Sequence, residues 1–259
     1  MGILNITPDS FSDGGQYLDV DQALKRAETM IEEGADIIDI GGESTRPGSD
    51  PVSVDEELKR ITPVIKALKE HSNIVISVDT YKPRVMEQVI DMGVGMINDV
   101  FALQQPGAID VIKKSNVGIC LMHMQGTPKT MQLNPIYQDV VNEVKLFLEE
   151  RANCLIAEGV KTERIILDPG FGFGKTFEHN ISLLQNLESF QALKFPLLVG
   201  LSRKSFIRKI LSGDHDDHLS GSISAAIFSI VKGAKIVRVH DVKETQSAIK
   251  IIQIAQGKI

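Results

Sequence analysis

The sequence has few of the features that mark secreted or membrane proteins. Its 259 residues include two cysteines and no tryptophan. Two cysteines cannot build a disulfide framework, which indicates a reducing compartment. No apolar stretch approaches the roughly 20 residues needed to span a bilayer, and the first ten residues have neither the basic nor the apolar segment of a signal peptide. We therefore expect a cytoplasmic protein with no membrane partner.

An excess of positive charge is also missing. The chain has 28 basic and 34 acidic side chains, which gives a net charge of −6. This balance provides no electrostatic basis for binding nucleic acid. Hydrophobic residues make up 42% of the chain and charged residues 24%, an ordinary composition for a globular protein.

A repeated pattern of helix, glycine and apolar run dominates the sequence. The runs are too short for helices and lack polar alternation, so they predict strands buried on both faces. Such strands are typical of a parallel sheet covered by helices. The glycines suit the left-handed conformation that closes a helix, at Gly34, Gly93, Gly159 and Gly233.

Eight apolar runs end in polar residues. The ends fall at Asn5, Asp39 to Glu43, Asp79, Asn98 to Asp99, His123, Asp168, Ser202 to Lys204, and His240. No linker or shift in composition divides the chain. We therefore predict an α/β protein in which residues 1–259 form one (β/α)8 TIM barrel domain, with the active site at the C-terminal ends of its strands. The alternative is a doubly wound open sheet, which more often has fewer strands and a glycine-rich first turn.

Helix signals lie between these runs. Apolar residues keep helical spacing from Val20 to Ile31 and from Val140 to Leu155. The segment from Ser53 to Glu56 has the spacing of a capping box that opens another helix.

Three strand ends carry hydrogen-bond acceptors: Asp79, Asn98 and Asp168. A carboxylate accepts paired hydrogen bonds from an amino group and a neighbouring ring N–H, so the set suits a planar heterocycle such as a pterin or guanine. For a single Asp, the alternative is a buried carboxylate that binds loop N–H groups or pairs with Lys204. Three such ends together favour the binding site.

Basic and amide side chains at other strand ends suit a phosphorylated ligand. Arg238 and His240 lie two apart on one predicted strand, so both can face the same side and would suit a phosphate or diphosphate clamp. The alternative for this pair is a surface ion pair near a strand end. Lys204 suits a ring carbonyl oxygen or a phosphate. Asn5 offers an amide oxygen to Mg²⁺, with diphosphate oxygens and waters completing the octahedron. Together with Mg²⁺, the three basic residues would gather positive charge at one rim.

Two long polar loops, residues 7–19 and 43–53, are interpreted as lids that exclude water. The glycine-rich segment 170–176 resembles a phosphate-binding loop, but Pro169 stands where that motif requires its first glycine. We therefore reject this motif. His123 has no partner signature for acid–base catalysis.

These motifs resemble those of the dihydropteroate synthase family, in the family's order and over nearly the whole chain. The matching segments are MGILNITPDSFSDGG, GGESTRPG, ISVDT, IND, MHMQGTP, DPGFGFGK, GLSRKSF and RVHD. The resemblance implies a homodimeric (β/α)8 barrel that joins 6-hydroxymethyl-7,8-dihydropterin diphosphate to p-aminobenzoate. The products would be 7,8-dihydropteroate and diphosphate, in the folate pathway that sulfonamides inhibit.

The resemblance also implies roles for individual residues. The pterin pocket would be lined by Asp79, Asn98, Asp168 and Lys204. Arg238 and His240 would bind the diphosphate, Thr45 would contact the pterin diphosphate, and Asn5 would help to hold Mg²⁺. Catalysis would fall to Asn5, Lys204, Arg238 and His240. The p-aminobenzoate site would be shaped by Phe11, Pro47 and Ser205.

Two other functions stay open at this point. A pterin-binding barrel of the methyltetrahydrofolate:corrinoid methyltransferase type would use similar carboxylates, but it needs neither the two lid loops nor the Arg238/His240 clamp. A pterin-binding homologue without catalytic activity is the second alternative.

Overall fold

The computed structural model describes residues 1–7, 16–211 and 218–257. The strands are β1 (Gly2–Asn5), β2 (Ile37–Gly41), β3 (Val75–Asp79), β4 (Met96–Asp99), β5 (Gly118–Met122), β6 (Ile165–Asp168), β7 (Leu198–Val199) and β8 (Ile236–Val237). The α-helices are α1 (Gln16–Glu32), α2 (Val54–His71), α3 (Pro83–Asp91), α4 (Ala108–Lys113), α5 (Val140–Ala157), α6 (Phe177–Gln185), α7 (Ser205–Ile210), α8 (His218–Val231) and α9 (Val242–Ala255). Two 3-10 helices, η2 (Thr162–Arg164) and η3 (Leu187–Leu193), precede β6 and β7.

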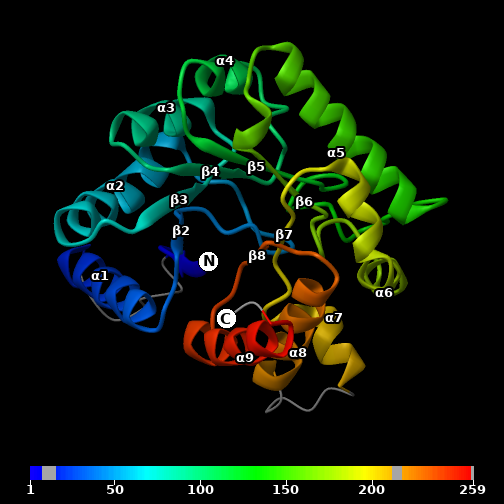
Figure 1. The fold of residues 1–259 in the computed structure, drawn as a ribbon. Coiled ribbons are helices and arrows are strands. Elements are labelled where there is room, and N and C mark those ends of the chain that lie inside the picture. The colour runs from blue at the N-terminus through cyan, green and yellow to red at the C-terminus, as the bar shows by residue number, and fades with distance from the viewer. Residues whose placement is uncertain (8–15, 212–217, 258–259) are drawn as a thin grey trace.

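The strands form a closed parallel barrel. Strands β1 to β6 pair in sequence order, and β7 pairs with β8. Single bridges from Leu167 to Leu197 and from Gly2 to Val239 join the two groups and close the ring. The helices surround it (Figure 1). This is the predicted (β/α)8 TIM barrel, and the open sheet is excluded.

The last two strands are shorter than the sequence predicted. Strand β7 stops at Val199 and β8 at Val237, although the apolar runs continue. After β8 ends, the backbone still forms hydrogen bonds with the neighbouring segments of the barrel wall. The Arg238 N–H donates to the Val199 carbonyl and the Val239 N–H to the Met1 carbonyl. The runs therefore keep their place in the barrel wall without forming a full ladder.

The predicted turns and helix starts are largely confirmed. All four turn glycines have positive φ, at 97°, 80°, 88° and 105° for Gly34, Gly93, Gly159 and Gly233. The Ser53 side chain caps α2 by accepting from the Glu56 N–H. The reciprocal half of the capping box is not formed, because the Glu56 carboxylate pairs with Arg60 instead.

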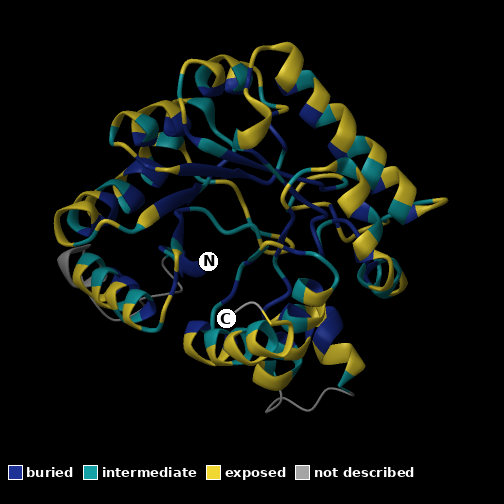
Figure 2. Ribbon diagram, in the orientation of Figure 1, coloured by how far each residue is buried: buried dark blue, intermediate teal, exposed yellow. Residues whose placement is uncertain are grey.

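The barrel separates an apolar wall from a partly polar interior. The helices pack on the outer faces of the strands, whose residues are buried, while the outer faces of the helices are exposed (Figure 2). A small apolar cluster of Met1, Met96, Cys120 and Leu198 fills the interior. The fully buried Asp39 and Ser77 lie beside each other on β2 and β3. Within the described ranges, no helix is long and apolar enough to cross a bilayer.

Candidate active site

A cavity of about 1330 Å³ opens at the C-terminal ends of the strands. It collects the predicted site residues that the structure describes. The cavity is lined by Asn5, Thr45, Pro47, Asp79, Asn98, Asp168, Lys204, Ser205, Arg238 and His240. Phe11 lies outside the described residues.

The predicted acceptors come from three strands. Asp79 and Asp168 end β3 and β6, and Asn98 lies near the end of β4. Asp168 Oδ1 accepts the Gly170 N–H at 2.7 Å, so this carboxylate binds its loop as well as lining the cavity. Burial raises the pKa of Asp168 to about 6 and that of Asp79 to about 7. Nearby cations, Lys204 for Asp168 and Arg238 for Asp79, oppose the effect of burial.

Arg238 is bound by carboxylates. Its Nε donates to Asp39 Oδ2 at 2.6 Å and its Nη2 to Asp79 Oδ2 at 3.0 Å. Burial alone would lower the pKa of Arg238, but Asp39 and Asp79 outweigh it and raise the pKa. The guanidinium is therefore shared between two strands of the barrel and is not dedicated to a phosphate group.

His240 does not carry the positive charge expected of it. Burial, with Arg203 and Arg238 nearby, lowers its pKa to about 4, so the ring is neutral at pH 7. Its Nδ1 lies 3.0 Å from the Ser202 hydroxyl, which also accepts the His240 backbone N–H. The hydroxyl hydrogen is then available to Nδ1, which favours the tautomer with the proton on Nε2. His240 thus offers a neutral N–H donor.

Lys204 contributes another positive charge to the cavity, whose lining also includes Arg26, Arg46, Arg203 and Arg208. Its Nζ lies 4.2 Å from the centroid of the Phe173 ring, in a cation–π contact. Burial and Arg238 lower the pKa of Lys204 to about 8, so it remains mostly charged at neutral pH.

Apolar side chains that the sequence analysis did not select line other parts of the cavity. Val100, Met122, Phe171 and Phe173 all face it. Small-molecule sites combine apolar walls with convergent polar groups, and side chains of both kinds line this cavity. Met122, Phe171 and Phe173 lie in the motifs MHMQGTP and DPGFGFGK. Nothing within these motifs indicates which of their apolar side chains face a cavity.

Lys175 is a second residue that sequence reasoning missed. It is 2% exposed, and its Nζ bonds to Gly170 O at 2.8 Å, Phe173 O at 3.1 Å and His123 Nδ1 at 2.9 Å. Burial lowers the pKa of Lys175 to about 7 and, with Lys175 beside it, that of His123 to about 2. His123 is therefore a neutral acceptor that helps to fix the loop after β6. The sequence signal that could have identified Lys175 is its position directly after the glycine-rich segment that contains Gly170, Gly172 and Gly174.

The predicted lid, residues 43–53, is fastened by several contacts, including one that ties its ends together and one that links it to a neighbouring loop. Glu43 Oε2 accepts the Val52 N–H at 2.9 Å, which ties together the two ends of the segment. The Gly48 N–H donates to Pro128 O at 3.0 Å and links the lid to the loop after β5. The side chains of this lid are thus held over the cavity from two directions.

The donor chemistry around Asn5 fits a weak magnesium site. Asn5 ends β1 and lines the cavity. The part of the chain that the structure describes contains no group of three or more His, Cys, Asp or Glu side chains that would cage a metal. Mg²⁺ keeps several waters and often binds through few protein ligands together with substrate phosphates. One amide oxygen in the same cavity as Arg238 and His240 matches that preference.

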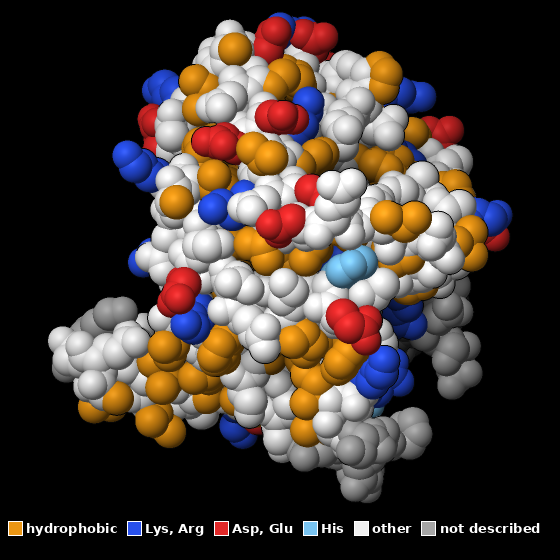
Figure 3. Space-filling view, turned by 90° about the vertical axis from the view of Figure 1, so that its right-hand side faces the viewer, with side chains coloured by type: hydrophobic (Ala, Val, Ile, Leu, Met, Phe, Trp, Pro, Cys, Tyr) orange, Lys and Arg blue, Asp and Glu red, His pale blue; other side chains and the backbone are white. Residues whose placement is uncertain are grey.

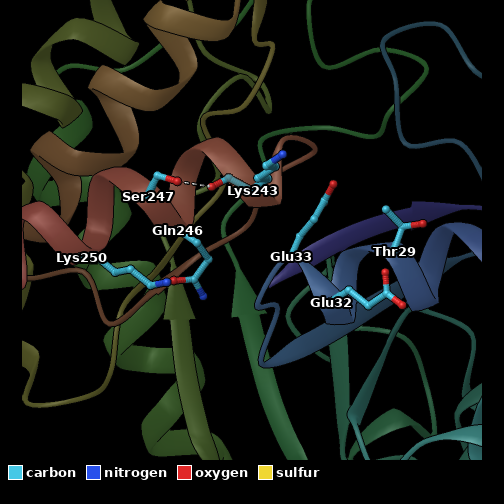
Figure 4. A pocket seen from close by; sticks show the side chains of 7 residues that line it. All are labelled: Thr29, Glu32, Glu33, Lys243, Gln246, Ser247 and Lys250. Carbon is cyan, nitrogen blue, oxygen red and sulfur yellow. Dashed lines mark hydrogen bonds between the residues drawn. The ribbon is translucent and has the colours of Figure 1, made fainter.

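A smaller hollow of about 420 Å³ lies between the surface helices α1 and α9 (Figure 4). It is lined by Thr29, Glu32, Glu33, Lys243, Gln246, Ser247 and Lys250, and it shares no residue with the strand-end cavity. The face that includes α5 and α6 shows basic and acidic side chains interspersed (Figure 3). The predicted site residues that the structure describes therefore lie in the strand-end cavity and not in the hollow between α1 and α9.

Comparison with known proteins agrees with this geometry. Residues 1–240 match the family described as pterin binding enzymes. The dihydropteroate synthase of Haemophilus influenzae is 50% identical over 253 residues, which cover 98% of this chain and 92% of that protein. The Yersinia pestis dihydropteroate synthase in a sulfonamide drug complex superposes with a TM-score of 0.93 at 45% identity, covering 99% of this chain and 94% of that one. The Xanthomonas albilineans dihydropteroate synthase with 4-aminobenzoic acid superposes with a TM-score of 0.93 at 45% sequence identity. The match covers 99% of this chain and 92% of that one.

The loop after β6 provides a test of how the site is supported. Gly170 has φ +68°, and a Cβ there would lie 1.9 Å from the His123 carbonyl oxygen. Gly170→Ala should therefore lower the free energy of unfolding by about 3 kcal/mol, from the left-handed backbone and the overlap together. Urea unfolding measures this loss. Gly159→Ala is the matched control, because Gly159 has φ +88° with nothing within 4 Å, and it should cost about 1 kcal/mol. Equal losses would contradict the steric argument.

Proposed function

Because this chain belongs to the family of pterin-binding enzymes, we propose that its strand-end cavity carries out the reaction of a dihydropteroate synthase. This transferase condenses 6-hydroxymethyl-7,8-dihydropterin diphosphate with p-aminobenzoate to give 7,8-dihydropteroate and diphosphate. The observation that carries the assignment is the convergence of acceptors from β3, β4 and β6 with Lys204 and Arg238 in one cavity. The 50% identity to the Haemophilus influenzae dihydropteroate synthase supports the same activity.

The cavity provides a place for each part of the two substrates. The pterin ring would bind Asp79, Asn98, Asp168 and Lys204, with the apolar side chains against its faces. Its diphosphate would receive hydrogen bonds from Arg238 and His240 and a contact from Thr45. The arylamine would occupy the outer rim at Pro47 and Ser205, both of which are exposed. Phe11 would complete that rim.

The reaction is a substitution at the methylene carbon. The bond from this carbon to the diphosphate oxygen breaks, and its electron pair leaves with the diphosphate. Arg238 and the His240 N–H stabilise the charge that develops on the leaving group. The amine of p-aminobenzoate then donates its lone pair to form the new C–N bond and releases a proton to solvent. The electron-rich dihydropterin stabilises the cationic carbon, so the path is dissociative and needs no dedicated general base.

Mg²⁺ is part of the proposal. Asn5 would hold it, together with diphosphate oxygens and water. When bound, Mg²⁺ would supply Lewis-acid neutralisation of the diphosphate charge. We also propose that residues 1–259 form a single domain and that the protein is cytoplasmic.

The assembly that we propose is a homodimer. Apolar side chains are exposed on the neighbouring helices α8 and α9, at Leu219, Phe228, Val231, Ile251 and Ile254. Exposed apolar patches of this kind are typical of protein–protein interfaces.

A single assay tests the proposed activity. Purified protein with the pterin diphosphate, p-aminobenzoate and Mg²⁺ should release diphosphate, and the release should depend on p-aminobenzoate and stop when EDTA removes the metal. Pterin binding without release would instead show a homologue that lacks catalysis. Methyl transfer from methyltetrahydrofolate to a corrinoid, with no synthase activity, would favour the methyltransferase alternative.

The role of Asp168 predicts a pH dependence. The ionised carboxylate must accept the N–H groups of the ring, and its pKa is about 6. Asp79, which is also assigned to the ring, has a pKa of about 7. The affinity for 6-hydroxymethylpterin should therefore be constant at high pH, fall about tenfold per unit of pH below ~7, and fall about 100-fold per unit below ~6, where both carboxylates become protonated. Asp168→Asn should weaken binding about 100-fold at pH 8, because an amide places a donor where acceptors are needed. Calorimetric titration with 6-hydroxymethylpterin measures both the pH dependence of the affinity and the effect of Asp168→Asn. Wild-type affinity in Asp168→Asn would show that the assigned role is wrong.

The dimer surface makes a separate prediction. Val231, on α8, is 54% exposed, and Val231→Glu should shift the protein from dimer to monomer because a charge would be buried at the interface. Light scattering after gel filtration measures the mass. Leu146→Glu on α5, where the side chain is 57% exposed, is the matched control and should leave the dimer intact. A wild-type monomer would overturn the proposal.

A further inference from the structure

A buried carboxylate below the mouth of the barrel contacts two residues of the proposed site. Asp39 lies two positions before Gly41, the last residue of β2, and it is 0% exposed. Its register partner on β3 is Ser77, which is also fully buried. Placing a carboxylate in this position is costly unless the charge is paired and hydrogen-bonded.

Both hydrogen-bond donors to Asp39 belong to the proposed site. Its Oδ2 accepts from Arg238 Nε at 2.6 Å and from Asn98 Nδ2 at 3.2 Å. Arg238 in turn donates from Nη2 to Asp79 at 3.0 Å. One carboxylate oxygen therefore joins a residue assigned to the pterin ring, Asn98, to a residue assigned to the diphosphate, Arg238.

This arrangement fixes which groups each partner presents. An ionised carboxylate only accepts hydrogen bonds, so the Asn98 amide must turn its NH₂ group toward Asp39. The Asn98 Oδ1 atom is buried and makes no hydrogen bond within the described part of the chain. The orientation thus leaves an acceptor for a ligand N–H. The fixed Nε and Nη2 of Arg238 likewise set the plane of its guanidinium.

Stability alone is a weak reason for such a group. Replacing a buried ion pair by apolar residues of similar volume is often neutral or stabilising, whereas removing one partner is costly. Elsewhere the barrel interior is filled by apolar side chains such as Met96 and Leu198. A charged side chain at this depth is better explained by what it holds in place.

We propose that Asp39 is a positioning residue that orients Asn98 and Arg238 toward the two ends of one substrate. The inference rests on the proposed function, because it needs the ring and the diphosphate to occupy the two ends of the same cavity. It predicts that one substitution at Asp39 weakens the binding of both halves of the substrate.

Asp39→Asn is the first test, since it keeps the shape and removes the charge. Calorimetry with 6-hydroxymethylpterin and, separately, with inorganic diphosphate should show each Kd raised by about 10- to 100-fold. The KM for the pterin diphosphate should rise similarly, while that for p-aminobenzoate should change by less than about threefold. A variant with a lower melting temperature but wild-type Kd values for both probes would overturn the proposal, because it would show a purely structural role.

Ser77→Ala is the matched control. It alters a fully buried polar side chain at the paired register position, and it should leave both Kd values within about threefold of wild type. A double-mutant cycle adds a second readout: in an Arg238→Gln background, Asp39→Asn should no longer affect diphosphate binding. Full additivity of the two losses would contradict the proposal.

Two outcomes separate this inference from the proposed function. A wild-type protein that binds neither probe overturns both. A wild-type protein that binds both probes and turns over, with unaffected Asp39 variants, overturns only the inference. If Asp39→Asn fails to fold, Asp39→Ser, which removes the charge with less bulk, is measured in the same way.

Discussion

The site depends on the pairing of Arg238 with the carboxylates of Asp39 and Asp79. These contacts join the segment after β8 to β2 and β3 across the barrel mouth, at 2.6 and 3.0 Å. Each partner is costly to bury alone. The two carboxylates hold Arg238 in its charged form, and Arg238 in turn opposes the rise in the pKa of Asp79 that burial causes. Because barrel closure places β8 near β1 and β2, the fold itself brings the guanidinium to these carboxylates.

The same network explains how an acidic protein prepares a site for an anion. The net charge is −6, yet Arg238 and Lys204 place positive charge at the cavity. Arg238 is held by carboxylates, and the ring of His240 is neutral at pH 7. The site therefore offers directed N–H donors more than an excess of charge, which suits a leaving group whose charge grows during the reaction.

Much of this arrangement is visible in the sequence, because parallel strands that end in polar residues must gather them at one rim. Asp79 and Asp168 were predicted on that ground, and the helix–glycine–strand repeat predicted the barrel. The hydrogen-bond and ion-pair partners of the site residues could not be predicted from the sequence. Asp39 was predicted at the polar end of an apolar run, but β2 continues to Gly41, and Asp39 meets donors 59 and 199 residues away. The neutral ring of His240 depends on its burial, and Lys175 binds backbone carbonyls that only the folded loop presents.

The difference in exposure between the floor and the rim of the cavity bears on evolution. Asp39, Asn98 and Asp168 are buried, with Asp39 bonded to Asn98 and Asp168 bonded to the Gly170 N–H. Most substitutions there would therefore affect folding and binding together. Pro47 and Ser205 are exposed, and substitutions at exposed positions usually change stability by less than about 0.5 kcal/mol. A lineage under selection by an inhibitor that mimics the arylamine can therefore vary the rim while the pterin floor stays fixed.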